Sequence, residues 1–296
     1  MIRVKDLYKT IDDEVILNHL DMNVEDGSIY GLIGPNGAGK TTLIRHLVGV
    51  LKQDSGKINI ESQPVYENSA IKNKIGYIPD DMYFIESSLK KNALLYKEIY
   101  PDWNQDRFEE LVHTFKLSLK KKINTFSKGM KKQAAFCLIM SIMPQYLILD
   151  EPIDGLDPVA RKLVWKYIID DVAQRQMTVL ISSHNLKELE GIVDHVGILY
   201  KGRMMKEFDL EYIQTNVHKI QVSFGDKEAD LNALNIVYQE ERGSVKMLII
   251  EDSLARIKTI IGDQYPLIFD ILPLSLEELF MYEVGGEDHD IQKLIF

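Results

Sequence analysis

Short apolar runs alternate with polar positions over the first 33 residues of the chain. A period of two is typical of half-buried strands, so this part predicts an antiparallel β-element that leads into a buried strand at residues 28–33. Residues 57–61 and 75–79 predict further short strands. From about residue 85 to residue 143 the apolar spacing becomes helical, with a turn at residues 100–104.

Strand and helix patterns alternate in the next part of the chain. Strands are expected at residues 146–150, 178–182 and 196–200, and helices at residues 158–174 and 186–191. Such alternation predicts a parallel sheet with helices on its faces, which is the α/β class. Residues 200–204 predict a hairpin centred on Lys201 and Gly202.

The charge of the chain is unevenly distributed. Its 296 residues have a net charge of −10, and residues 209–296 hold 7 basic and 17 acidic side chains, which accounts for the whole excess. Strand patterns at residues 219–224 and 245–250, followed by helical spacing at 254–261, predict a small α+β domain there. We therefore expect two domains, residues 1–208 and residues 209–296.

The longest apolar stretch, residues 134–143, stops at Pro144 and is too short to cross a bilayer. It holds Cys137, the single cysteine, so no disulfide can form within the chain, which fits a reducing cytoplasm. We expect Cys137 to be a buried, inert thiol. An acidic chain is also a poor partner for the phosphate backbone of nucleic acids.

A glycine-rich loop at residues 34–42 carries the first chemical signal. Its sequence Gly-Pro-Asn-Gly-Ala-Gly-Lys-Thr-Thr fits the pattern that wraps nucleotide phosphates, between a predicted strand and a predicted helix at residues 42–49. Backbone N–H groups and the helix dipole attract anions there. We expect Lys40 to reach the β- and γ-phosphates and Thr41 to ligate Mg²⁺. The candidate phosphate-binding residues are Gly34, Asn36, Gly37, Ala38, Gly39, Lys40, Thr41 and Thr42.

Two carboxylates end the predicted strand at residues 146–150. Asp150 and Glu151 follow four apolar residues, so the strand would deliver them to the edge of the sheet where ligands bind. Phosphoryl transfer needs a carboxylate near Mg²⁺ and a group that orients the attacking water. Asp150 suits the first role and Glu151 the second. The alternative is a strand that ends in a solvated acidic turn.

These motifs, together with three others, make residues 1–208 resemble the ATP-binding cassette of ABC transporters. Ser127-Lys128-Gly129-Met130 is similar to the family's Leu-Ser-Gly-Gly-Gln signature, with Lys128 and Met130 as departures. Residues 154–158 match the family's D-loop, with Asp157, and residues 182–186 supply the switch histidine, His184. The resemblance implies a P-loop NTPase fold with a parallel-sheet core, an antiparallel β-subdomain and a helical subdomain at about 85–143. It also implies that Ser127, Gly129 and Asp157 contact ATP held by a second subunit, and that Glu151 and His184 are catalytic.

Two further positions depart from the family pattern. Asp80 stands where the family has the Q-loop glutamine, and as a carboxylate it could still approach Mg²⁺. The adenine-stacking aromatic falls at Ile11, with Tyr8 nearby. Residues 116–132 hold seven lysines and no acid, which we interpret as a solvated helical face. The alternative is a patch that steers ATP or touches lipid headgroups or a membrane partner.

The signature variant, residues 100–104 and the tail at residues 274–280 resemble ABC-2-type exporters of Gram-positive bacteria linked to antimicrobial-peptide export and bacitracin-type resistance. This implies an ATPase with ATP and Mg²⁺, a second ATP-binding subunit, and a separate permease at the cytoplasmic face of the membrane. The acidic tail would be an accessory domain.

Two alternatives remain beside the transporter reading. One is a non-transport ABC ATPase acting on ribosomes or DNA, although those forms usually have two cassettes or long coiled coils. The other is a GTPase or kinase, although residues 73–76 do not complete the Asn-Lys-x-Asp guanine motif.

Overall fold

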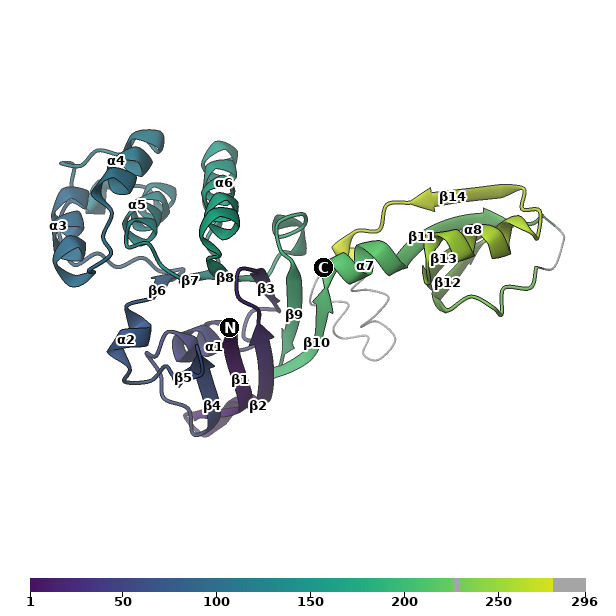
Figure 1. Cartoon of the computed structure of the whole chain (residues 1–296), viewed down its shortest axis with the longest axis horizontal. Coiled ribbons are helices and arrows are strands. Elements are labelled where there is room, and N and C mark those ends of the chain that lie inside the picture. Colours follow the sequence, from purple (N-terminus) through teal and green to yellow (C-terminus); the bar gives the residue numbers. More distant parts are fainter. Residues whose placement is uncertain (226–228, 279–296) are drawn as a thin grey trace. The chain divides into compact units, whose positions relative to one another are not determined.

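The computed structural model describes residues 1–225 and 229–278, which form two compact units (Figure 1). The first unit comprises residues 1–184 and 191–207, and the second comprises residues 185–190 and those described from 208 onward. Leu279 and Phe280, at the end of the tail that carries part of the family resemblance, lie outside the described residues.

The first 60 residues form most of a four-stranded sheet in the order β2-β1-β4-β5. β1 pairs antiparallel with both β2 and β4, which confirms the antiparallel β-element. Alternate residues of β1, such as Ile2 and Val4, are buried in a core that also holds Leu43 and Leu47 of the first helix. The sheet therefore packs against the helix that follows the glycine-rich loop. The strands are β1 (Ile2–Ile11), β2 (Glu14–Val24), β4 (Ser55–Ile60) and β5 (Gln63–Pro64).

A second sheet has six strands in the order β10-β9-β3-β8-β7-β6. The β3–β8, β3–β9, β6–β7 and β7–β8 pairs are parallel, as the strand and helix alternation predicted. All residues of β3, β7 and β8 are buried, which is typical of a parallel sheet covered on both faces. Lys201 and Gly202 form the predicted hairpin turn with positive φ angles of 47° and 73°. The strands are β3 (Ile29–Ile33), β6 (Ile75–Ile78), β7 (Tyr146–Asp150), β8 (Thr178–Ser183), β9 (His195–Tyr200) and β10 (Arg203–Asp209).

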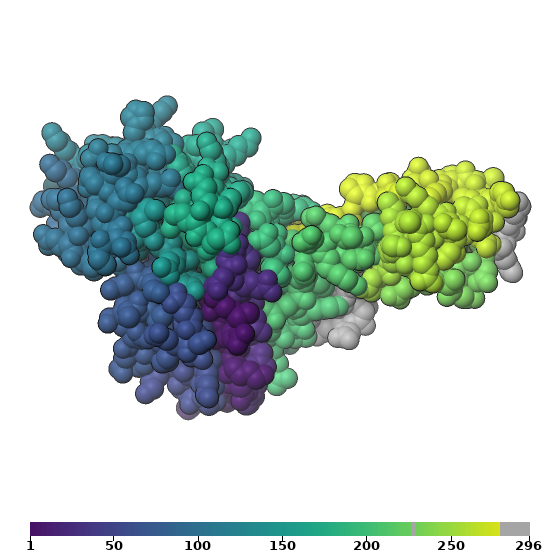
Figure 2. Space-filling view, viewed as in Figure 1, coloured from purple at the N-terminus to yellow at the C-terminus, as the bar shows by residue number. Residues whose placement is uncertain are grey.

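The helices α3, α4 and α5 gather beside one another at one side of the first unit (Figure 1), and in Figure 2 their residues, in blue, form a lobe of its surface. Ser88, Asn104 and Ser127 cap these helices, each accepting a hydrogen bond from a backbone N–H in the first turn. Cys137 is fully buried in α5, and burial raises the pKa of its thiol, as expected for an inert cysteine. The helices of this unit are α1 (Lys40–Leu47), α2 (Ser69–Lys72), α3 (Leu89–Ile99), α4 (Gln105–Thr114), η1 (Ile123–Thr125), α5 (Lys128–Ser141) and α6 (Pro158–Arg175).

Three details of the sequence prediction are wrong. The helix after the glycine-rich loop begins at Lys40, two residues earlier than expected, because Gly39 is its N-cap and offers no side-chain signal. Residues 186–191 form only the short 3-10 helix η2 (Leu186–Glu188). The lysine-rich segment is no continuous helical face, since residues 116–122 lie in a loop and Lys132 is buried.

The second unit contains a four-stranded sheet in the order β12-β13-β11-β14, with α8 packed on one face. Its core joins Ile220 and Val222 of β11 and Leu248 of β13 to Ile257 and Ile261 of α8. All strand pairs are antiparallel, so the unit is an α+β fold. Its elements are α7 (Leu210–Asn216), β11 (Val217–Ser223), β12 (Ile236–Arg242), β13 (Val245–Glu251), α8 (Leu254–Gly262) and β14 (Ile268–Leu272).

Candidate active site

The glycine-rich loop connects the buried strand β3 to helix α1. Gly37 and Gly39 have φ angles of 80° and 108°, a region that glycine adopts without the strain of a side chain. A Cβ atom on Gly34 would lie 2.2 Å from the carbonyl oxygen of Leu199, so that position also requires glycine. The loop is therefore a tight glycine turn directly before the N-terminus of α1, a position where backbone N–H groups commonly bind an anion.

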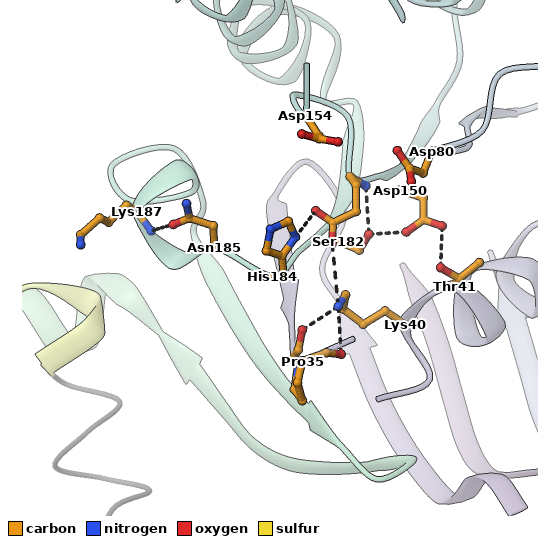
Figure 3. A network of polar contacts seen from close by, with 12 residues as sticks. Pro35, Lys40, Thr41, Asp80, Asp150, Asp154, Ser182, His184, Asn185 and Lys187 are labelled. Atoms are coloured by element: carbon orange, nitrogen blue, oxygen red, sulfur yellow. Dashed lines mark hydrogen bonds and ion pairs between the residues drawn. The ribbon is translucent and has the colours of Figure 1, made fainter. Parts of the chain in front are cut away.

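Lys40 lies inside this loop, with 7% of its side chain exposed. Its ammonium donates to the carbonyl oxygens of Gly34 at 2.6 Å and Pro35 at 3.2 Å (Figure 3). Burial lowers the pKa of Lys40, and the nearby carboxylates of Glu151 and Asp150 partly oppose that shift. The ammonium is thus held at the centre of the loop by groups that a bound phosphate could replace.

Helix α1 and strand β7 bring a hydroxyl and a carboxylate together. Thr41 Oγ1 donates to Asp150 Oδ2 at 2.8 Å, and Ser182 Oγ of β8 donates to Asp150 Oδ1 at 2.6 Å (Figure 3). Asp150 is 2% exposed, so these hydrogen bonds offset the cost of burying its charge. Two oxygen ligands that suit Mg²⁺ therefore lie side by side.

Glu151 occupies the next position, and its backbone turns sharply there. Its φ angle of 48° is unusual for a residue with a side chain. Its carboxylate accepts from His184 Nδ1 at 2.9 Å and lies 3.8 Å from the ammonium of Lys40. The structure thus joins the two residues expected to be catalytic, from the ends of two neighbouring strands.

A hollow of about 330 Å³ contains most of the candidate residues. A larger hollow of about 900 Å³ lies beside α3 and α4, but none of the candidate site residues lines it. The residue types, and not the size, therefore identify the site. The smaller hollow is lined by Ile16, Pro35, Asn36, Gly37, Ala38, Gly39, Lys40, Thr41, Thr42, Asp80, Asp150 and Glu151.

Four expected nucleotide contacts do not line this hollow: Gly34, Ser127, Gly129 and Asp157. Ser127 caps α5, and Asp157 caps α6, where its carboxylate accepts from two backbone N–H groups at 3.0 Å. Gly129 lies two positions after Ser127, and a Cβ atom there would lie 2.6 Å from the carbonyl oxygen of Gly155. If Ser127, Gly129 and Asp157 contact ATP, it would therefore be ATP held by a second subunit.

The region expected to contact the base holds no stacked ring over the loop among the described residues. Ile11 is 39% exposed, and Ile16 rather than Ile11 lines the hollow. The ring of Tyr8 packs against His19, with 5.3 Å between the ring centroids.

Sequence reasoning missed Lys132. Its side chain is 2% exposed, and its ammonium lies 3.1 Å from Asp80 Oδ1 and donates to the carbonyl oxygen of Glu151. Lysines are normally exposed, so a lysine in this lysine-rich segment gave no indication that it would be buried. The only available signal was its place two positions before the apolar run that begins at residue 134.

Comparison with known proteins relates this chain to one family. The model of the ABC transporter family matches residues 17–154. The ABC transporter ATP-binding protein YtrB of Bacillus subtilis (strain 168) is 30% identical over 289 residues, which cover 97% of this chain and 99% of YtrB. The bacitracin transport ATP-binding protein BcrA of Bacillus licheniformis is 31% identical over 302 residues, covering 97% and 98%.

A solved structure, described as that of the ATP binding subunit of an ABC transporter, superimposes with a TM-score of 0.66 at 28% identity, and covers 72% of this chain and 92% of its own. These relatives do not favour the non-transport alternative. The chain belongs to the family of ABC transporter ATP-binding proteins, which makes it the ATPase subunit of a transporter.

Proposed function

We propose that this ATPase holds MgATP on residues 34–42, closes over it with a second ATP-binding subunit, and thereby drives a separate permease. The observation that carries the proposal is the convergence of Lys40, Thr41, Asp150 and Glu151 on one hollow, with His184 bonded to Glu151. Each of these groups suits a separate task in phosphoryl transfer.

Phosphate binding falls to the loop and Lys40. Gly39, the N-cap of α1, offers no side-chain acceptor, so the first backbone N–H groups of the helix are available to phosphate. Lys40 would exchange its bonds to Gly34 and Pro35 for the β- and γ-phosphates. Its burial strengthens that attraction, because the local dielectric is low.

The residues present fit Mg²⁺. No cluster of three His, Cys, Asp or Glu side chains lies within residues 1–225 and 229–278, but magnesium in such enzymes needs only one or two carboxylates besides phosphate and water. Thr41 and Asp150 would hold the ion, with Asp80 at the same hollow as a further ligand. Bound Mg²⁺ would neutralise charge that develops on the phosphates.

Hydrolysis requires a group that orients water in line with the γ-phosphate. Glu151 would accept a hydrogen bond from that water, since its carboxylate lies 3.8 Å from the phosphate-binding ammonium of Lys40. His184 Nδ1 is hydrogen-bonded to the carboxylate of Glu151 at 2.9 Å, so it would hold that carboxylate in place. The same imidazole could also contact the γ-phosphate. The pair would form one water-orienting unit.

Closure of the site falls to the second subunit. Ser127 and Gly129 lie at the start of helix α5 and Asp157 at the start of α6, and none of the three lines the hollow. We propose that they cover the γ-phosphate of the other subunit, where a helix N-terminus and a hydroxyl suit an anion. Both homodimers and heterodimers satisfy this arrangement.

The permease must be another chain if transport is to occur through this ATPase. Within the part of the chain that the structure describes, no helix is long and apolar enough to cross a membrane. We propose that the ATPase binds a permease at the cytoplasmic face of the cell membrane and exports an amphipathic or antimicrobial peptide. The name of BcrA, a bacitracin transport protein, supports that cargo class. We propose that residues 209–296 form an accessory domain.

Affinity purification from native membranes tests the transport function. Tagged Glu151→Gln protein with MgATP should retain a multi-span membrane protein in stoichiometric amount, because slow turnover would hold the assembled state. The reconstituted pair of wild-type ATPase and that protein should hydrolyse ATP faster when the exported peptide is added. Recovery of ribosomal proteins or nucleic acid, without a membrane partner, would contradict the transport function.

A further inference from the structure

Lys132 is a buried cation that joins two parts of the active site. Its side chain is 2% exposed, although it lies only five positions after Ser127 in the signature segment. Its ammonium contacts Asp80 Oδ1 at 3.1 Å and the carbonyl oxygen of Glu151 at 2.5 Å. A buried charge is costly unless it is paired and hydrogen-bonded, and these two contacts offset that cost.

The contact to Glu151 acts on a strained peptide. A left-handed φ of 48° in a residue with a side chain costs on the order of 1–2 kcal/mol and persists only where the surroundings impose it. Around Glu151 the N–H donates to Ser182 on β8, and the carbonyl oxygen accepts from Lys132. The two hydrogen bonds hold the backbone before and after the Cα atom of Glu151, and so they restrict the direction in which its carboxylate leaves the strand.

The contact to Asp80 places a positive charge beside a group of carboxylates. Asp80, Asp150 and Glu151 are three carboxylates around one hollow. The ammonium of Lys132 lies closer to Asp80 than the exposed Lys128 does, at 3.1 Å against 3.8 Å. Lys132 thus offsets the repulsion among these carboxylates and holds Asp80 beside the end of β6.

We propose that Lys132 is a positioning residue for ATP hydrolysis, which ties the start of helix α5 to the peptide of Glu151 and to the carboxylate of Asp80. Because Ser127 caps the same helix, a shift of the signature segment would change the direction of the water-orienting carboxylate through the side chain of Lys132. The inference rests on the proposed role of Glu151.

The test compares Lys132→Met with Lys132→Arg. Methionine fills a similar volume but removes the charge and the donor, while arginine keeps both. We expect Lys132→Met to lower kcat about 10- to 100-fold, the scale of a misplaced catalytic group, with the dissociation constant and KM for ATP changed less than about twofold. Lys132→Arg should recover a substantial part of kcat.

Lys131→Met is the matched control, because Lys131 is the neighbouring lysine of α5 and lines a separate hollow beside Met82 and Glu86. It should hydrolyse ATP at close to the wild-type rate. Thermal unfolding of every variant shows whether the protein is still folded, so that a loss of kcat in a folded variant can be assigned to the missing contact. The double variant Lys132→Met/Asp80→Asn removes both charges, so it provides a folded protein if the unpaired Asp80 destabilises the single variant.

Each outcome has a defined meaning. A folded Lys132→Met protein with unchanged kcat overturns the inference, as does wild-type turnover of the double variant, in which the bond to Glu151 is still absent. A loss of ATP affinity as large as the loss of kcat/KM would also overturn it, in favour of a purely structural role. Full activity of Glu151→Gln would instead contradict the proposed catalytic role of Glu151 itself.

Discussion

At the scale of single residues, Lys40 shows how the protein keeps a charge ready for a ligand. In the described conformation its ammonium is held by two carbonyl oxygens of its own loop and by the more distant Glu151. Carbonyl oxygens compensate a buried cation less fully than anions do, which agrees with the lowered pKa of Lys40. Binding of ATP phosphates would supply the missing negative charge.

This predicts the pH dependence of ATP binding. The protonated ammonium attracts phosphate, so affinity should be constant below the pKa of Lys40 and fall as the pH rises through it. Because that pKa is lowered, the fall should begin below the usual lysine value of about 10.4. Titration with a fluorescent ATP analogue over a series of alkaline pH values measures the effect. Lys40→Arg, which stays charged, should remove the pH dependence, and constant wild-type affinity up to about pH 10.4 would contradict the prediction.

At the scale of elements, an ion pair connects helix α4 to helix α6. Asp171 of α6 has 6% of its side chain exposed, and it lies 2.9 Å from Arg107 of α4 and 2.7 Å from Arg175. Arg107 also packs on the ring of Tyr167, 4.8 Å from its centroid. The carboxylate of Asp171 is therefore shared by the two guanidinium groups.

Replacement of Asp171 should reduce stability. Asp171→Ala leaves two partly buried guanidinium groups without their shared partner, so we expect the free energy of unfolding to fall by about 3 kcal/mol, the lower end for a broken buried pair. Urea unfolding of the full chain measures this. Asp170→Asn, which alters the preceding carboxyl group, should change stability by less than about 0.5 kcal/mol. Equal stabilities of Asp171→Ala and wild type would show that the ion pair has no role in holding α4 to α6.

The strands of the parallel sheet could be predicted closely from the sequence, because fully buried strands are continuous apolar runs. β7 begins and ends at the expected residues, 146 and 150, where the change from apolar to acidic side chains is abrupt. Residues 186–191 also contain apolar side chains at helical spacing, but they form only one 3-10 turn. So short a segment lacks the length that makes a helical pattern distinctive.

The residues of the active site that belong to local sequence motifs could be predicted. The residue that reaches the site from a distant part of the chain could not. The loop at residues 34–42 and the Asp150-Glu151 pair are visible as sequence patterns, and the structure brings them to one hollow. Lys132 has partners 52 and 19 positions away, at Asp80 and Glu151. A lysine run is normally solvated, so nothing local distinguishes the one side chain that the fold buries.

At the scale of the whole molecule, one chain supplies two separate parts of the expected ATP site. The hollow with Lys40, Asp150 and Glu151 is one part, and Ser127 and Gly129 at the start of α5 are the other. Because Ser127 and Gly129 do not line the hollow of their own chain, we infer that the working ATPase contains a second subunit. The catalytic cycle would then alternate between open and ATP-closed pairs.

The most direct test of this account is the mass of the Glu151→Gln protein in solution, measured by sedimentation with and without MgATP, beside its rate of ATP hydrolysis. We predict that ATP still binds, that hydrolysis falls at least about 100-fold through loss of the water-orienting carboxylate, and that the 34.1 kDa chain becomes a stable pair. Ser127→Arg in the same background should prevent pairing while leaving ATP binding to the single chain. Wild-type hydrolysis by Glu151→Gln protein that remains a single 34.1 kDa chain would contradict the account.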